Sequence, residues 1–364
     1  MSEWKKVRLG EIANYVNEKI DIKAFDTSLY ISTDSMLKDK GGIGTPESIP
    51  ESGKVTKYQH NDILVSNIRP YFKKIWFSNR EGGCSNDVLV FRANDNIDST
   101  FLYYVLSDDS FFDHMMSSAN GTKMPRGNRK LIPSFEIPLP PLSTQHRIAS
   151  ILSRYDSLIE NYQKQIKLLE EAAQRLYKEW FIDLRFPGHE NTNIIDGVPE
   201  GWEKKKVNSI IELQSGFAFK SSTFDDNGAY KIVTIKNVKD GAFDGDNVSR
   251  IVAIPEKMPK HCVLADGDIL LSLTGNVGRV CIVNGKNYLL NQRVAKLATD
   301  FKAFTYCLFR SREMFIEINN LANGAAQQNV SPIRIGEMKI LLPNNKLRHS
   351  CISPWQYNHV IQRS

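Results

Sequence analysis

The sequence has few of the features that mark secreted, membrane-spanning or metal-binding chains. No apolar run approaches the roughly 18 residues that a spanning helix needs, and the opening MSEWKK begins no signal-peptide core. The five cysteines are scattered and form no CxxC pair, so neither a disulfide framework nor a zinc site is indicated. We therefore expect a folded chain in a reducing cytoplasm, with no membrane partner.

Motifs of catalysis are missing as well. The sequence contains no GxxxxGK[ST] phosphate loop, no HExxH or GxSxG motif, and no [DN]PP[FY] loop of the kind that adenine methyltransferases place around a flipped base. The stretch TGNVGR at 274–279 has two glycines without the GxGxxG spacing, and it is typical of a tight loop after a strand. We expect a non-catalytic protein that binds no cofactor or metal itself.

The chain does contain an internal repeat. Five segments of the first half return in the same order about two hundred residues later, which indicates a tandem pair of homologous domains. The matched segments are 4–8 with 201–207, 62–67 with 268–273, 101–104 with 304–307, 120–122 with 323–325, and 137–140 with 340–343. Short β-rich runs bounded by Gly, Asn and Pro alternate with helical segments in each half. The predicted fold class is α+β, with two mixed α/β domains.

A heptad seam lies between the two halves. Apolar residues there alternate steps of four and three, which predicts a long coiled-coil-type helix over 143–186. A narrow apolar stripe needs cover, so we expect these residues to pair with another helix or to dock a partner: Ile148, Leu152, Tyr155, Ile159, Tyr162, Ile166, Leu169, Leu176 and Trp180. The alternative, a helix lying on a globular core, fits less well because the stripe is unbroken.

The basic residues are clustered, although Lys and Arg outnumber Asp and Glu only by 47 to 41. The windows 66–80, 115–135 and 269–299 contain no acid. Lys and Arg neutralise phosphates, whereas Arg, Asn and Gln discriminate base edges. We therefore predict a DNA interface formed by Asn67, Arg69, Tyr71, Lys73, Lys74, Lys123, Arg126, Asn128, Arg129, Lys130, Thr274, Asn276, Arg279, Asn291, Gln292, Arg293, Gln327, Gln328 and Asn329. The alternative is that these are solvated loops without a ligand.

Four motifs carry a resemblance to a known family. They are WxxVRLGEI at 4–12, VPEGW at 198–202, GDILLS at 267–272, and IPLPPLSTQHRIA at 137–149. With them the chain resembles the specificity (S) subunit of type I restriction–modification systems over about residues 1–343. The resemblance implies two DNA target-recognition domains, here 1–142 and 187–343, and a conserved spacer helix at 143–186. Each domain would read one half of a split double-stranded DNA sequence.

The resemblance also implies partners and cofactors. Modification subunits dock on the spacer helix and carry S-adenosylmethionine with the N6-adenine methylation chemistry, and restriction subunits bring ATP/Mg-driven translocation and cleavage. The family's recognition domains are too variable to transfer contact residues. The DNA-contact residues above therefore come from charge and residue type alone.

The end of the chain departs from the family pattern. A second helix is expected after Pro343, but residues 344–364 contain neither the Gln…Arg-Ile start nor the heptads of such a helix. We expect an atypical, disordered tail and a truncated variant whose central helix borrows its partner from another copy, a separate fragment or a modification subunit. The alternative function is a scaffold or decoy that occupies modification subunits without productive DNA recognition.

Overall fold

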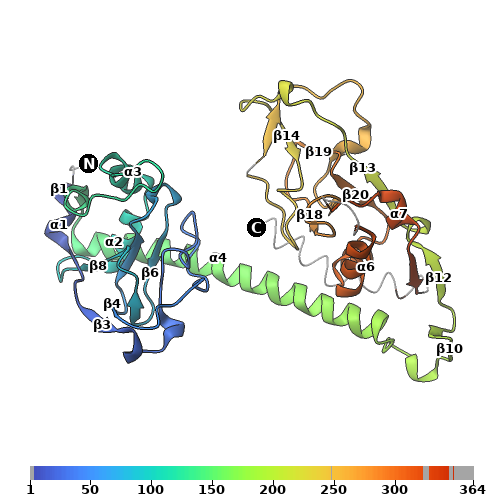
Figure 1. Cartoon of the computed structure of the whole chain (residues 1–364), viewed down its shortest axis with the longest axis horizontal. Coiled ribbons are helices and arrows are strands. Elements are labelled where there is room, and N and C mark those ends of the chain that lie inside the picture. Colours follow the sequence, from blue (N-terminus) through green and yellow to red (C-terminus); the bar gives the residue numbers. More distant parts are fainter. Residues whose placement is uncertain (1–3, 247, 323–327, 344–346, 348–364) are drawn as a thin grey trace. The chain divides into compact units, whose positions relative to one another are not determined.

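The computed structural model describes residues 4–246, 248–322, 328–343 and 347 (Figure 1). The chain divides into two compact units, unit 1 (Met1–Glu160) and unit 2 (Asn161–Ser364). Their boundary falls inside the long helix α4 (Leu142–Tyr177), so each unit contains one part of that helix. None of the helices in these residues is long and apolar enough to cross a membrane.

Unit 1 is built on a four-stranded sheet of order β2-β8-β5-β6. A three-stranded sheet has the order β3-β4-β7, and β1 pairs with β9. The elements are β1 (Lys5–Arg8), α1 (Leu9–Ile12), β2 (Ala13–Tyr15), β3 (Lys19–Asp21), β4 (Lys54–Tyr58), β5 (Ile63–Ser66), β6 (Ile75–Phe77), β7 (Gly82–Cys84), β8 (Val88–Ala93), α2 (Ser99–Leu106), α3 (Asp109–Ser117) and β9 (Glu136–Leu139).

Unit 2 repeats this plan. Its first four-stranded sheet has the order β13-β20-β17-β18, its second has the order β15-β14-β19-β16, and β12 pairs with β21. The elements are β10 (Ile194–Ile195), β11 (Val198–Pro199), β12 (Glu203–Lys206), β13 (Glu212–Ser215), β14 (Tyr230–Val233), β15 (Ser249–Ile251), β16 (Val263–Leu264), β17 (Ile269–Ser272), β18 (Val280–Ile282), β19 (Tyr288–Leu290), β20 (Val294–Ala298), α5 (Lys302–Arg310), α6 (Arg312–Ala322), α7 (Pro332–Gly336) and β21 (Lys339–Leu342).

The predicted α+β fold with two homologous halves is confirmed. The central strand of each unit is buried on both faces, which explains its unbroken apolar sequence. In β5, Ile63 and Val65 join the cluster that includes helices α2 and α3, and Leu64 joins the cluster that includes Tyr58 of β4. In unit 2, β17 divides its side chains between two clusters in the same way.

The repeated Asp-Ile-Leu motif has a local structural cause. Asp62 accepts a hydrogen bond from Gln59 N at 2.8 Å, and Asp268 accepts one from Ala265 N at 2.9 Å. The residue before each aspartate has a positive φ, 68° at Asn61 and 83° at Gly267. Each carboxylate therefore closes a turn that sends the chain into the central strand.

The glutamine of the IPLPPLSTQHRIA motif fixes the start of α4 on unit 1. Gln145 is buried; its Oε1 accepts from Asp98 N at 2.9 Å and its Nε2 donates to Pro140 O at 2.9 Å. Asp98 in turn caps α2 by accepting from Phe101 N. The amide of Gln145 thus connects the start of α4 with the start of α2 and with the residue that follows β9. Both of its partners are buried or half-buried backbone groups, which need such a hydrogen bond.

Helix α4 ends earlier than predicted. The helix expected over 143–186 begins at Leu142 and is α-helical to Tyr177, followed by a π-helical turn at Lys178–Ile182. Leu184 has a left-handed φ of 58°, and Arg185 N donates to Glu179 O, which stops the helix before Pro187. The tail expected at 344–364 lies outside the described residues except for Leu347, which packs against the core of unit 2.

Candidate nucleic-acid interface

In unit 1, three loops are joined into one surface, which we call loop cluster 1 (residues 67–74, 85–87 and 120–130). Asn67 N donates to Asp87 O at 2.8 Å, Gly127 N donates to Asn67 O at 3.2 Å, and Arg69 N donates to Pro125 O at 2.7 Å. Two of the acid-free windows of the sequence are therefore neighbours in space. All three contacts are between backbone groups, so they fix the loops whatever side chains the loops carry.

Unit 2 builds the same arrangement, loop cluster 2 (residues 273–279, 291–293 and 328–330). Leu273 N donates to Arg293 O at 3.0 Å, Val330 N to Leu273 O at 2.9 Å, and Gly275 N to Gln328 O at 2.9 Å. Each bond has its counterpart in loop cluster 1, between residues that occupy equivalent places in the repeat. The structure thus brings together most of the predicted DNA-contact residues, in two equivalent sets.

The predicted contact residues differ in how accessible they are. Those with exposed side chains are Tyr71, Lys123, Arg126, Arg129, Lys130, Asn276, Gln292, Arg293, Gln328 and Asn329. Those of intermediate exposure are Arg69, Lys73, Lys74, Asn128, Arg279 and Asn291. Asn67 and Thr274 are only 5% and 8% exposed, so neither presents its side chain to a ligand. Gln327 lies outside the described residues.

The windows without acids in the sequence are not without acids in space. Lys73 Nζ lies 2.6 Å from Asp109 Oδ2, and Lys40 Nζ lies 3.0 Å from Asp109 Oδ1. Hydrogen bonds from Lys73 and then from Lys40 hold the pKa of Asp109 below its usual value. Arg126 Nη2 likewise lies 3.2 Å from Asp87 Oδ2. Sequence reasoning missed Lys40, Asp87 and Asp109, because no signal in a local window reveals a partner that folding brings in.

Lys74 is also engaged within unit 1. Its Nζ donates to Thr33 O at 2.6 Å, and partial burial lowers the pKa of Lys74. The cations of loop cluster 1 that are free to bind a ligand are therefore residues other than Lys73 and Lys74. In the part of the chain that the structure describes, neither Lys123 nor Lys130 has an ion-pair partner for its exposed ammonium group.

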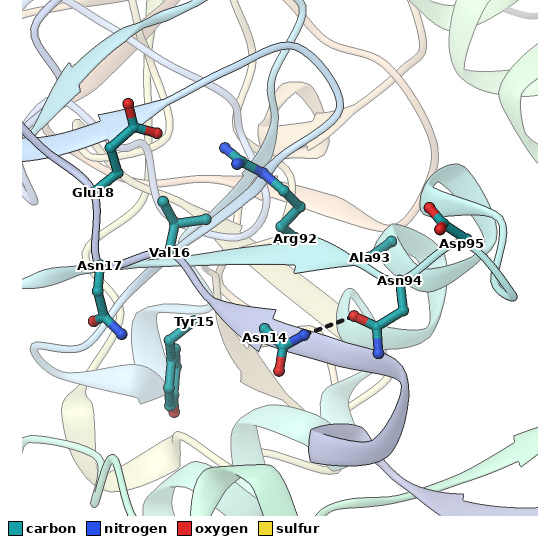
Figure 2. A pocket seen from close by; sticks show the side chains of 9 residues that line it. All are labelled: Asn14, Tyr15, Val16, Asn17, Glu18, Arg92, Ala93, Asn94 and Asp95. Atoms are coloured by element: carbon teal, nitrogen blue, oxygen red, sulfur yellow. Dashed lines mark hydrogen bonds between the residues drawn. The ribbon is translucent and has the colours of Figure 1, made fainter.

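A pocket of about 520 Å³ lies beside loop cluster 1, and Figure 2 shows the side chains that line it. Tyr15 OH donates to Arg129 O at 3.2 Å and so connects the pocket to the cluster. Polar groups of the pocket are already paired. Asn14 Nδ2 donates to Asn94 Oδ1 at 2.7 Å (Figure 2). Arg92 donates hydrogen bonds to both carboxylate oxygens of the buried Asp62. We therefore assign it no ligand.

The apolar seam of α4 is exposed in its middle. Leu152, Tyr155 and Ile159 are 38%, 63% and 53% exposed. Near the ends of the helix, Ile148 packs on the core of unit 1 and Trp180 on that of unit 2. The remaining predicted seam residues, Tyr162, Ile166, Leu169 and Leu176, are of intermediate exposure. Ile151 and Leu158, which lie outside the seam, are also 47% and 45% exposed. An exposed apolar stripe of this kind is typical of a docking surface.

Each unit also attaches to its own part of α4 through a carboxylate. In unit 1, Tyr104 OH donates to Asp156 Oδ2 at 2.7 Å. In unit 2, Glu170 accepts hydrogen bonds from Tyr306 OH and from Arg310 Nη1. Arg310 is only 14% exposed, and its Nη2 also lies 3.4 Å from Asp240 Oδ2.

The sequence matches the model of the family described as type I restriction modification DNA specificity domain over residues 1–171 and 199–347. The chain belongs to this family. The specificity subunit of the type I restriction enzyme MjaVIII from Methanocaldococcus jannaschii is 30% identical over 363 residues, covering 94% of this chain and 83% of that protein. The HindI specificity subunit of Haemophilus influenzae is 27% identical over 192 residues, covering 50% and 42%.

A solved structure supports the same fold for this type I specificity protein. The crystal structure of a type I restriction–modification S subunit from M. genitalium matches it with a TM-score of 0.61 and 16% identity, covering 99% of this chain and 91% of that one. The two matched segments of the family model coincide with the internal repeat, since each contains one of the two loop clusters.

Proposed function

We propose that this type I specificity protein is the DNA-recognition subunit of a restriction–modification complex and reads a bipartite double-stranded target. One observation carries the proposal: the same three-loop arrangement, matched hydrogen bond by hydrogen bond, occurs twice in one chain. Two equivalent readers imply two half-sequences, because each loop cluster offers Arg, Asn or Gln side chains suited to base edges. The chain itself is the non-catalytic subunit of a multisubunit DNA methyltransferase and endonuclease.

The exposed middle of α4 is proposed to dock the modification subunits, because an apolar stripe on a helix needs a partner that covers it. A partner helix that covers Leu152, Tyr155 and Ile159 would gain part of the about 1.5–3 kcal/mol that complete burial of an apolar side chain contributes. S-adenosylmethionine is expected on those modification subunits, and ATP and Mg on restriction subunits that join the complex. A second copy of this chain, or a separate fragment, is the competing occupant.

The proposal is tested by selection from random DNA. The full chain is purified with its modification subunits, and the complex selects duplexes from a randomised library. We expect a consensus of two short sequences separated by a gap of fixed length. Binding without sequence preference would contradict recognition and would favour a scaffold or decoy, whereas a complex that contains two copies of this chain and no modification subunit would identify the competing occupant of α4.

The salt dependence of binding is expected to fall when the free lysines of loop cluster 1 are removed. Replacing Lys123 and Lys130 together by Ala should reduce the slope of log K against log salt by about 2, since each phosphate contact contributes roughly 0.9. Replacing Lys73 and Lys74 by Ala should reduce it less, because Asp109 and Thr33 O already engage those ammonium groups. The measurement is a titration at several salt concentrations. Equal effects of the two double variants would show that the internal partners release their lysines on binding.

A further inference from the structure

Loop cluster 2 contains an exposed amide held by a buried hydroxyl. Asn329 is exposed, and its Oδ1 accepts a hydrogen bond from Thr274 Oγ1 at 3.0 Å. Thr274 is 8% exposed, and it pairs with Asn329 in an antiparallel β-bridge. The buried hydroxyl of Thr274 therefore restrains the amide oxygen of Asn329, although the asparagine as a whole is exposed. A binding group held by a buried neighbour is pre-organised, so it loses little conformational freedom when it binds.

The surroundings of Asn329 suit a base pair better than a phosphate. Gln328 precedes it, and Gln292 and Arg293 lie in the neighbouring loop. All three side chains are exposed. Leu273 connects the two loops, because its N–H donates to Arg293 O and its carbonyl accepts from Val330 N. Asn, Gln and Arg are the side chains that form bidentate hydrogen bonds with purine edges in the major groove. Arg293 has no ion-pair partner among the described residues, and so it is available to DNA.

The equivalent place in loop cluster 1 is built differently. The matched bridge pairs Ile68 with Arg126, so an apolar side chain replaces Thr274 and a cation replaces Asn329. Asp87 stands where unit 2 has Arg293, because its carbonyl accepts the matching hydrogen bond, and it pairs with Arg126 at 3.2 Å. Loop cluster 1 therefore presents a paired cation at the point where loop cluster 2 presents a fixed amide.

We propose that Asn329 is a specificity-determining residue that reads one base pair for unit 2, and that Thr274 is its positioning residue. The inference rests on the proposed DNA-recognition function and adds to it the residue that discriminates. It also distinguishes the equivalent positions of the two units, since the matched place in unit 1 carries Arg126, whose guanidinium pairs with Asp87.

The test compares base-preference profiles of variant complexes. The full chain with its modification subunits selects from a duplex library randomised over both half-sequences. Asn329→Ala should lose preference at one base pair by roughly tenfold or more, with the other positions unchanged. Thr274→Val should lose part of the preference at that same base pair. Thr274→Ser keeps the hydroxyl and should retain the preference of the wild type. Asn320→Ala is the matched control, because Asn320 is an exposed asparagine of α6 outside loop cluster 2, and it should leave every base preference intact.

The outcomes separate this inference from the proposed function. A wild-type complex with no bipartite preference overturns both. A bipartite wild-type profile that Asn329→Ala leaves unchanged overturns the role of Asn329 alone. If Thr274→Val lowers affinity equally for all sequences and lowers the melting temperature of the chain, the hydroxyl supports the fold and the positioning role is overturned.

Discussion

Placing aspartate at both Ile159 and Ile166 is expected to abolish assembly with the modification subunits while leaving the chain folded. Ile159 is 53% exposed, and neither Ile159 nor Ile166 belongs to or packs against the hydrophobic core clusters of the described residues, so the cores of the isolated chain stay intact. A partner helix would forfeit two apolar contacts and would have to bury two carboxylates. The combined cost of about 4 kcal/mol or more in binding free energy corresponds to a dissociation constant that is roughly a thousandfold higher. Calorimetric titration of the subunits measures it.

A matched control is available on the opposite face of the helix. Ser150 and Ser157 are exposed, are spaced as Ile159 and Ile166 are, and lie about half a turn away from the seam. Aspartates at these two positions add the same two negative charges to the helix as the isoleucine variant does, but they leave the apolar seam unchanged. We expect Ser150→Asp with Ser157→Asp to assemble normally. Normal assembly of the isoleucine variant would instead show that the seam is not the docking surface.

Replacing Glu170 by Gln is expected to destabilise unit 2 by about 3 kcal/mol, since removing one partner of a buried ion pair leaves the other charge uncompensated. Arg310 is 14% exposed, its Nε is buried without a partner among the described groups, and burial lowers the pKa of Arg310. Its remaining acid, Asp240, is 68% exposed and lies 3.4 Å away. The expected result is a melting temperature several degrees lower, measured by thermal denaturation.

The attachment of α4 to unit 2 provides the second readout of the same variant. Hydrogen exchange over residues 161–177 should become faster, because Glu170 joins that part of the helix to α5. Glu171→Gln is the control: Glu171 pairs with Arg175 at 3.8 Å, and their side chains are 44% and 82% exposed. Exposed pairs of this type contribute little. Equal effects of Glu170→Gln and Glu171→Gln would refute the importance of the buried network.

Much of the fold follows from sequence pattern. Of the repeated segments, 62–67 contains β5 (Ile63–Ser66), 101–104 lies in α2, and 304–307 lies in α5. These elements were accessible because their signals are local: an apolar run between turn residues for β5, and a capping aspartate ahead of the helical period for α2. The end of α4 could not be predicted in this way, because the left-handed residue that stops the helix is Leu184 and not the glycine that usually occupies such a position.

The candidate site was only partly accessible for the opposite reason. Charge windows located both loop clusters, but the state of each side chain depends on distant residues. Asp109 is 36 residues from Lys73, and Asn329 is 55 residues from Thr274. Such contacts are set by which loops the fold places together. Local composition therefore indicates which loops bind a ligand, and tertiary contacts decide which of their side chains are free to bind it.

The backbone bonding of the loop clusters has a consequence for how such a protein diversifies. Main-chain atoms alone supply the three matched bonds in each unit, and these bonds persist with Arg126 in one unit and Asn329 in the other. Substitutions there alter the chemistry offered to a target at little expense to the scaffold. A lineage can thus acquire new sequence preferences one residue at a time, keeping an intact framework throughout.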